Sequence, residues 1–104
     1  MARAPVAQSP EVTLREAADI FEERNEQYGD SYHRIGELMI VLFPNGITLR
    51  DANDFNRFCV AMLMVSKIDR YFANYDSGGH RDSLVDNAVY STMLAELDQI
   101  MKMK

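Results

Sequence analysis

Charged side chains lie in line with apolar stripes at three places in this chain of 104 residues. Glu22 and Glu26 stand four residues apart, a spacing that puts both on one face of a helix. Asp86 precedes Tyr90 of a later apolar stripe by one helical turn, and a third stripe ends in residues 67–70, which include two cations and an acid. These groups need partners, solvent or a ligand, because burying them alone costs several kcal/mol. Carboxylates and cations in a partly apolar cleft are typical of a binding or catalytic site.

Four helices are expected to position these groups, because apolar residues recur at helical spacing and strand signals are weak. Thr13 is the expected N-cap of the first helix, Thr48 that of the third, and Asp82 or Ser83 that of the fourth. The expected helices cover about 13–29, 30–43, 49–73 and 82–101. Short connections predict an all-α, antiparallel four-helix bundle: one domain over 11–104, preceded by a flexible arm over 1–10.

Charge and hydropathy argue against two classes of partner, nucleic acids and membranes. The net charge is −5 and no basic cluster is visible, so a nucleic-acid partner is not expected. The longest unbroken apolar run covers eight residues, 58–65, whereas a membrane span needs about 20. The single cysteine excludes an internal disulfide framework. We therefore expect a cytoplasmic protein with no membrane partner.

The predicted topology brings the ends of the first and third helices to one pole, together with the starts of the second and fourth. The charged and aromatic residues expected at this pole are Glu22, Glu26, Tyr28, Asp30, His33, Lys67, Asp69, Arg70, Asp82 and Asp86. The opposite pole is expected to hold fewer inward-directed charges. This clustering makes the first pole the candidate site.

Simpler roles compete with a functional one at each position. Glu22 and Glu26 fit a solvated helix face, and Lys67 and Arg70 fit pairing with Asp69 or with the end of their helix. Asp86 stands three residues after Ser83, a spacing that fits a capping box as well as it fits a role in ligand binding. The two histidines, His33 and His80, fit structural roles. The clustering, rather than any single residue, favours a site.

Four segments of the chain carry a resemblance to a known family. They are residues 23–30 (ERNEQYGD), 33–35 (HRI), 65–70 (VSKIDR) and 79–90 (GHRDSLVDNAVY). They resemble small phage-encoded proteins that are similar to the MazG-like, all-α nucleoside-triphosphate pyrophosphohydrolase superfamily. The resemblance spans about residues 14–97 and implies a helical bundle, usually dimeric or tetrameric, that acts on a nucleotide in the host cytoplasm.

The same resemblance implies roles for individual residues. In active members carboxylates hold Mg²⁺, which binds the triphosphate and activates water. By this resemblance the catalytic candidates are Glu23, Glu26 and Asp86; the metal ligands Glu22, Glu26, Asp82 and Asp86; and the ligand-binding residues Arg24, Tyr28, Asp30, His33, Lys67, Arg70, His80 and Tyr90. Lys67 and Arg70 would meet phosphate oxygens, and Tyr28 would stack on a base.

Departures from the family pattern keep other functions open. Ser83 stands where active members have an acid, and Asn87 follows Asp86 where an apolar residue is usual. The first hypothesis is therefore a Mg²⁺-dependent pyrophosphohydrolase. The second is a non-catalytic sponge that sequesters a nucleotide-derived host immune signal, and the third is a structural or interaction bundle.

Self-association is expected on separate grounds. The second helix carries Ile40 and Val41 off its main apolar stripe, the third is apolar on every side over 58–65, and the fourth ends near Ile100, Met101 and Met103. One bundle of four short helices cannot cover all of these side chains. We expect a homo-oligomer, most simply a two-fold dimer.

Overall fold

The computed structural model describes residues 7–28 and 31–104, and within these ranges all regular elements are helices, with no strand. The elements are α1 (Pro10–Tyr28), α2 (Ser31–Leu42), α3 (Ala52–Ala73), a short 3₁₀ turn (Tyr75–Ser77) and α4 (Arg81–Lys102). The all-α class predicted from the sequence is confirmed. None of the helices in the described ranges has the length and apolar character needed to cross a membrane.

The first helix begins earlier than predicted. The amide N–H of Val12 donates to the hydroxyl of Ser9 at 3.4 Å, and the amide of Thr13 donates to the Ser9 carbonyl at 3.2 Å. Pro10 follows Ser9 and is favoured at the first helical position, where its missing N–H leaves no bond unmade. The prediction of Thr13 as N-cap is therefore wrong, and the helix starts inside the segment expected to be an arm.

The caps of α3 and α4 also differ from the prediction. Asp51, not Thr48, caps α3, because its carboxylate accepts the amide N–H of Asp54 at 2.8 Å. His80 caps α4, because its Nδ1 accepts the amide N–H of Ser83 at 3.3 Å. Each helix therefore begins within three residues of its predicted start, with a different capping side chain.

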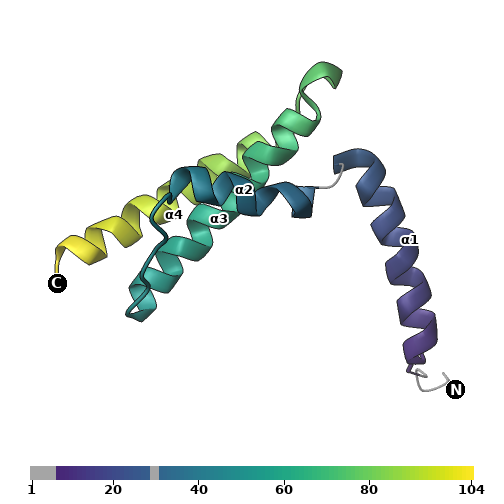
Figure 1. Ribbon diagram of the computed structural model, residues 1–104, viewed down its shortest axis with the longest axis horizontal. Helices are drawn as coiled ribbons and strands as arrows, with labels where there is room; N and C mark the ends of the chain where they lie inside the picture. Colours follow the sequence, from purple (N-terminus) through teal and green to yellow (C-terminus); the bar gives the residue numbers. More distant parts are fainter. Residues whose placement is uncertain (1–6, 29–30) are drawn as a thin grey trace, which may run out of the picture.

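Helices α3 and α4 form an antiparallel hairpin, the two long arms that run side by side in Figure 1. Side-chain amides fasten it: Asn53 Nδ2 donates to the carbonyl of Leu97, and Asn87 Nδ2 donates to the carbonyl of Met64, both at 3.1 Å. The connection between the helices ends at Gly79, whose φ of +81° favours glycine. A Cβ there would lie 2.8 Å from Cε2 of Tyr71, so the site excludes a side chain as well.

Helix α2 lies against α3, whereas α1 projects away from the other three helices (Figure 1). The radius of gyration is 18.5 Å, and a compact chain of this length would have about 13 Å. In a single chain, α1 does not pack alongside the hairpin. A closed bundle of four antiparallel helices would therefore need helices from another copy.

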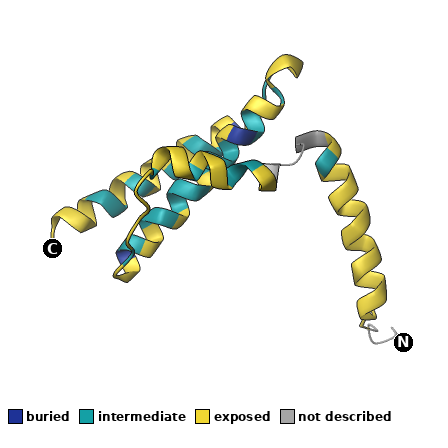
Figure 2. Ribbon diagram, in the orientation of Figure 1, coloured by how far each residue is buried: buried dark blue, intermediate teal, exposed yellow. Residues whose placement is uncertain are grey.

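The burial pattern of the single chain is inverted. Among the described residues no hydrophobic side chain is buried, while Asn53, Asp69 and Ser83 are (Figure 2). The chain exposes 8486 Å², whereas a compact monomer of this mass would expose about 5,900 Å². The buried side chains of Asn53 and Asp69 connect neighbouring helices, and the described apolar side chains of the single chain stay partly or fully exposed.

Candidate functional site

One predicted pair of site residues does meet across the hairpin. The ammonium of Lys67 on α3 lies 2.8 Å from a carboxylate oxygen of Asp86 on α4. The Lys67 side chain is only 16% exposed, whereas that of Asp86 is 45% exposed. The Lys67 side chain is therefore largely covered, and its counter-ion is half-exposed.

Two further candidates flank this pair. Arg70 lies one helical turn beyond Lys67, in the last turn of α3, and is half-buried. Tyr90 lies one turn beyond Asp86 on α4 and is also half-buried. The side chain of Asn74 donates to the carbonyl of Arg70 at 2.8 Å, which closes the C-terminal end of α3. The Lys67–Asp86 pair is thus flanked by an arginine on the side of the loop and by a tyrosine on the other side.

His80 and Ser83 serve the start of α4. His80 Nδ1 lies 2.6 Å from the hydroxyl of Ser83, in addition to accepting the Ser83 amide, and Ser83 is fully buried. Because His80 is the cap, a capping box between Ser83 and Asp86 does not form. Asp82 is exposed in the first turn of α4, where a carboxylate favours the helix N-terminus.

The candidates on α1 and at the start of α2 lie elsewhere. Glu22, Glu23, Arg24 and Glu26 are exposed on α1. His33 is exposed on α2, where its ring lies 4.2 Å from that of Tyr32, centroid to centroid. The side chain of Tyr28 and all of Asp30 fall outside the described residues.

The carboxylates do not gather into a metal site within one chain. In residues 7–28 and 31–104, no group of three or more His, Cys, Asp or Glu side chains is placed to hold a metal ion. Mg²⁺ needs near-octahedral oxygen ligands, and Asp86 already holds an ammonium. The residues expected as metal ligands, Glu22, Glu26, Asp82 and Asp86, therefore do not form a ligand set for Mg²⁺ within the single chain.

Sequence reasoning missed one strong ion pair near this end. The guanidinium of Arg34 on α2 donates twice to the carboxylate of Asp69 on α3, with both distances 3.2 Å. Asp69 is only 8% exposed. The position of Asp69 on an apolar face of α3 was the signal that it has a partner, because a buried acid needs a cation nearby. Arg34, one turn inside α2, is that cation.

Asn87 is the second residue whose role the sequence did not reveal. Its Nδ2 donates to Met64 across the hairpin, but its Oδ1 is a buried side-chain acceptor without a hydrogen-bond partner. This explains why an amide stands where an apolar residue was expected: it fastens α4 to α3. The acceptor left over lies next in sequence to Asp86.

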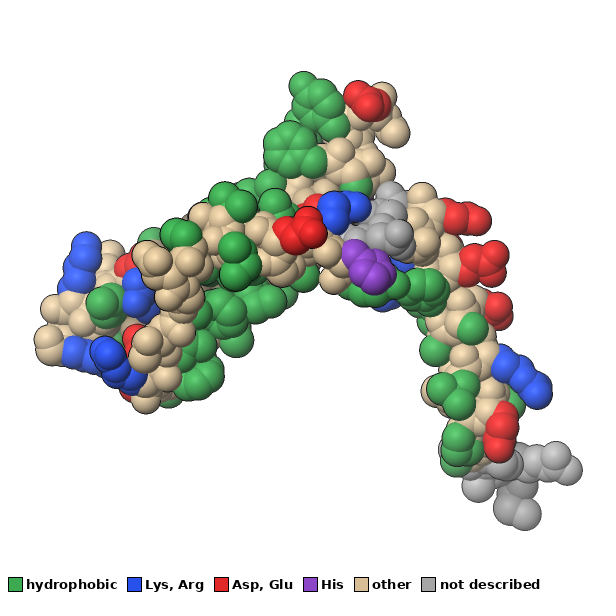
Figure 3. Space-filling model, in the orientation of Figure 1, with side chains coloured by type: hydrophobic (Ala, Val, Ile, Leu, Met, Phe, Trp, Pro, Cys, Tyr) green, Lys and Arg blue, Asp and Glu red, His purple; other side chains and the backbone are tan. Residues whose placement is uncertain are grey.

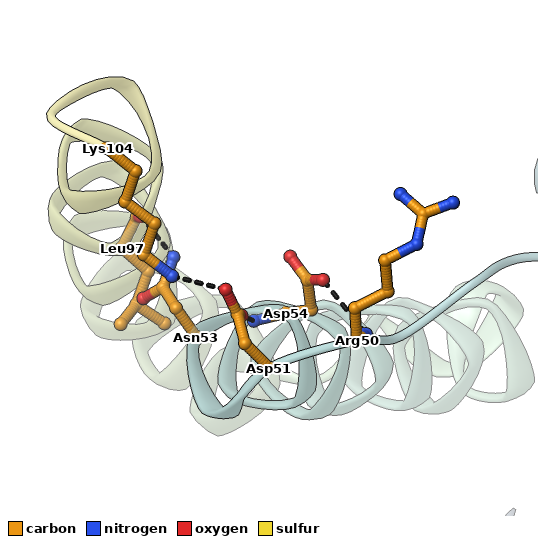
Figure 4. Close-up of polar contacts among 6 residues, drawn as sticks. All are labelled: Arg50, Asp51, Asn53, Asp54, Leu97 and Lys104. Atoms are coloured by element: carbon orange, nitrogen blue, oxygen red, sulfur yellow. Dashed lines mark hydrogen bonds and ion pairs between the residues drawn. The ribbon is translucent and has the colours of Figure 1, made fainter.

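The opposite end of the hairpin is as charged as the first. Arg57 Nε lies 2.8 Å from a carboxylate oxygen of Asp98. The ammonium of Lys104 donates to Asp51 (Figure 4). The hydrogen bond from Lys104, followed by the one from the Asp54 amide, holds the pKa of Asp51 below its usual value. These four side chains are 33–50% exposed, so they are less buried than Asp69 and Lys67 at the loop end, as expected.

A cleft of about 390 Å³ opens at that second end, beside the turn between α2 and α3. Its walls are apolar at Phe43, Phe58 and Leu94, and its charged groups are Asp54, Arg57 and Asp98. Comparison of the chain with protein-family models, with curated proteins and with solved structures found no match.

Proposed function

We propose that the chain binds a nucleotide or a nucleotide-derived small molecule at the loop end of the α3–α4 hairpin. The observation that carries the proposal is the largely covered side chain of Lys67, whose ammonium lies 2.8 Å from Asp86. A lysine ammonium binds phosphate as a point charge, and Arg70 one turn further adds a planar fork of donors.

Asp86 holds the place that a phosphate would take. Its half-exposed carboxylate contributes at most about 1 kcal/mol through such a pair, and hydrogen bonds from charged donors to phosphate contribute about 1.5–3 kcal/mol. A phosphate can therefore displace Asp86 from Lys67, and the Asp86 side chain can turn toward solvent. Tyr90 lies one turn along α4, where its ring and hydroxyl would meet the remainder of the ligand.

Binding without hydrolysis is the form of this function that the contacts favour. Among the described residues the carboxylates do not assemble a metal-ligand set, and the carboxylate of Asp86 is paired with a lysine. A protein of this kind would sequester its nucleotide, as a sponge for a nucleotide-derived immune signal does.

Mg²⁺-dependent pyrophosphohydrolysis is the second candidate. One observation favours it: Glu22, Glu23 and Glu26 are all exposed on α1, where they are accessible to another copy of the chain. Carboxylates from two chains would then be required for one site, in place of the single-chain set implied by the family resemblance.

The deciding experiment incubates the purified protein with a nucleotide library, with and without Mg²⁺, and identifies by mass spectrometry what the protein retains and releases. Intact nucleotide retained in both conditions supports sequestration. Pyrophosphate and nucleoside monophosphate formed only with Mg²⁺ support the second candidate. If neither outcome is observed, the remaining candidate is a structural or interaction protein. Lys67→Ala is the test variant, and Arg57→Ala, which breaks an ion pair at the other end of the hairpin, is its matched control.

A further inference from the structure

Helix α1 has one apolar face and one charged face. At 100° per residue, Leu14, Ala17, Ala18 and Phe21 share one side of the helix, whereas the acids Asp19, Glu23 and Glu26 lie away from it and Glu22 stands at its edge. Leu14 is 69% exposed and Phe21 53% exposed, so the apolar face has almost no cover within its own chain. Such a helix requires a partner surface, because most helical stability in proteins comes from packing of the apolar face.

A matching surface lies on the other arm of the bent molecule. Figure 3 shows apolar side chains along the inner side of α1 and along the edge of the α2–α3 body that faces the same concavity, with acidic side chains on the outer side of α1. A groove of about 530 Å³ follows α3 beside α2; its walls are Tyr32, Ile35, Cys59, Met62, Leu63 and Ser66, with Asp69 at its margin. We call this the α2–α3 groove.

The α2–α3 groove is continuous with the apolar face of α1. The ring of Phe21 on α1 meets the ring of Tyr32 edge to face, with centroids 6.0 Å apart, and Tyr32 is itself a wall of the groove. One apolar surface therefore runs from α1 across Tyr32 to α3. Its two halves diverge, so α1 cannot cover the groove of its own chain in this conformation.

We propose that two copies of the chain form a two-fold dimer in which α1 of each lies in the α2–α3 groove of the other. A two-fold axis makes the exchange reciprocal, since the same pair of surfaces is used twice. The helix of 19 residues is about 28 Å long, so a large part of both apolar surfaces is buried at once. The acidic face of α1 stays in solvent.

The area to be covered is that of an obligate interface. The 8486 Å² that the chain exposes exceeds the surface of a compact monomer of its mass by about 2,500 Å². Two chains that each bury this excess form an interface of about 5,000 Å², within the range of permanent dimers and far above that of transient contacts. A second copy is therefore an occupant whose size matches the uncovered surface.

Native Cys59, exposed in the groove, allows a direct test of the exchange. Leu14→Cys, Ala18→Cys and Phe21→Cys place a second thiol at three successive positions on the apolar face of α1, and Asp19→Cys is the matched control on the charged face. A disulfide needs Cα atoms about 4.4–6.8 Å apart, so only a position opposite Cys59 can bond. Mild oxidation and a non-reducing gel report the product, and light scattering gives the mass of the unmodified protein.

The expected result is a mass near twice 11.9 kDa, with a disulfide-linked dimer from at least one apolar-face variant. The control should form no more linked dimer than the parent protein, which carries Cys59 alone. Three results would overturn the exchange: a mass of one chain at micromolar concentration, linkage as efficient from Asp19→Cys, or a disulfide formed within one chain. An oligomer with no linkage from any apolar-face variant would also overturn it, because another surface would then join the copies.

Discussion

Arg34 and Asp69 are 35 positions apart in the chain, yet the guanidinium of the first holds the carboxylate of the second through two hydrogen bonds of 3.2 Å. Asp69 is one of three buried residues in the described part of the chain, and all three are polar. This pair joins α2 to α3, so the walls of the α2–α3 groove are set by an ion pair rather than by an apolar core.

Replacing Arg34 with alanine leaves the buried carboxylate of Asp69 without its guanidinium. The free energy of unfolding is expected to fall by about 1–3 kcal/mol, the cost of an unsatisfied buried group. Asp69→Asn in the same background should recover part of the loss, because it removes the buried charge. Urea titrations of the three proteins measure this, and equal stability of Arg34→Ala and the parent would contradict it.

Lys67→Ala and Arg70→Ala should each weaken nucleotide binding by roughly 1–3 kcal/mol, the range for hydrogen bonds to charged groups. Titration calorimetry with the nucleotide identified by mass spectrometry gives the affinities. Arg57→Ala removes a cation of the opposite end and should bind as the parent does. Unchanged affinity in both loop-end variants would remove these two residues from the site.

Asp86→Asn separates the two candidate functions. If a phosphate displaces Asp86 from Lys67, neutralising the carboxylate removes a competitor, and the affinity for nucleotide without Mg²⁺ should rise several-fold. The loss of the ion pair should lower the free energy of unfolding by less than about 1 kcal/mol. A fall in affinity seen only in the presence of Mg²⁺ would instead assign Asp86 to a metal ion.

His80 distinguishes a helix cap from a ligand. Asparagine is a good N-cap residue, so His80→Asn should retain most of the stability, whereas His80→Ala should lose about 1 kcal/mol. Thermal unfolding followed by circular dichroism compares the three proteins. If His80→Asn kept the stability but lost nucleotide binding, the imidazole would be a ligand as well as a cap.

Acid stability should depend on Asp51 and Lys104. The hydrogen bond from Lys104 keeps the pKa of Asp51 in the folded chain below its value of about 3.8 in model peptides. A carboxyl group whose pKa is lowered on folding stabilises the fold above its unfolded pKa, and the contribution disappears as the pH falls through the folded pKa. Lys104→Ala should raise the pKa of Asp51 toward its usual value, which an NMR titration of that carboxyl group measures. Asp51→Asn keeps a capping side chain while removing the titration of this group, so the helix content of the variant should change less than that of the parent as the pH falls through the folded pKa of Asp51.

Helix existence could be predicted from this sequence because it depends on local spacing. Each helix was expected within a few residues of its observed range, and the loop after Ala73 was placed correctly. The N-cap residues could not be predicted in the same way. Several side chains that can cap a helix stand close together in the sequence, and the backbone geometry decides which of them accepts the hydrogen bond. Ser9 before Pro10 was the overlooked signal: proline is favoured at the first helical position, so the residue before it is the natural cap.

The sequence predicted part of the candidate site. It did not predict the features that depend on how the helices pack against one another. Lys67 and Asp86 meet because an antiparallel hairpin pairs the end of one helix with the start of the next, and helix order alone implies this. The position of α1 does not follow from helix order, since its apolar face can pack on its own chain or on another. For that reason Glu22 and Glu26 were expected beside Asp86, and the single chain does not gather them there.

The absence of buried apolar side chains among the described residues has a consequence for how this protein folds. In the proposed dimer a second chain supplies the missing cover, so folding would be a bimolecular reaction whose rate and midpoint depend on concentration. The temperature of half-unfolding should therefore rise with the total amount of protein. Below a threshold set by the dissociation constant the chains would be unfolded and open to proteases, and the quantity synthesised would itself determine whether the protein acts.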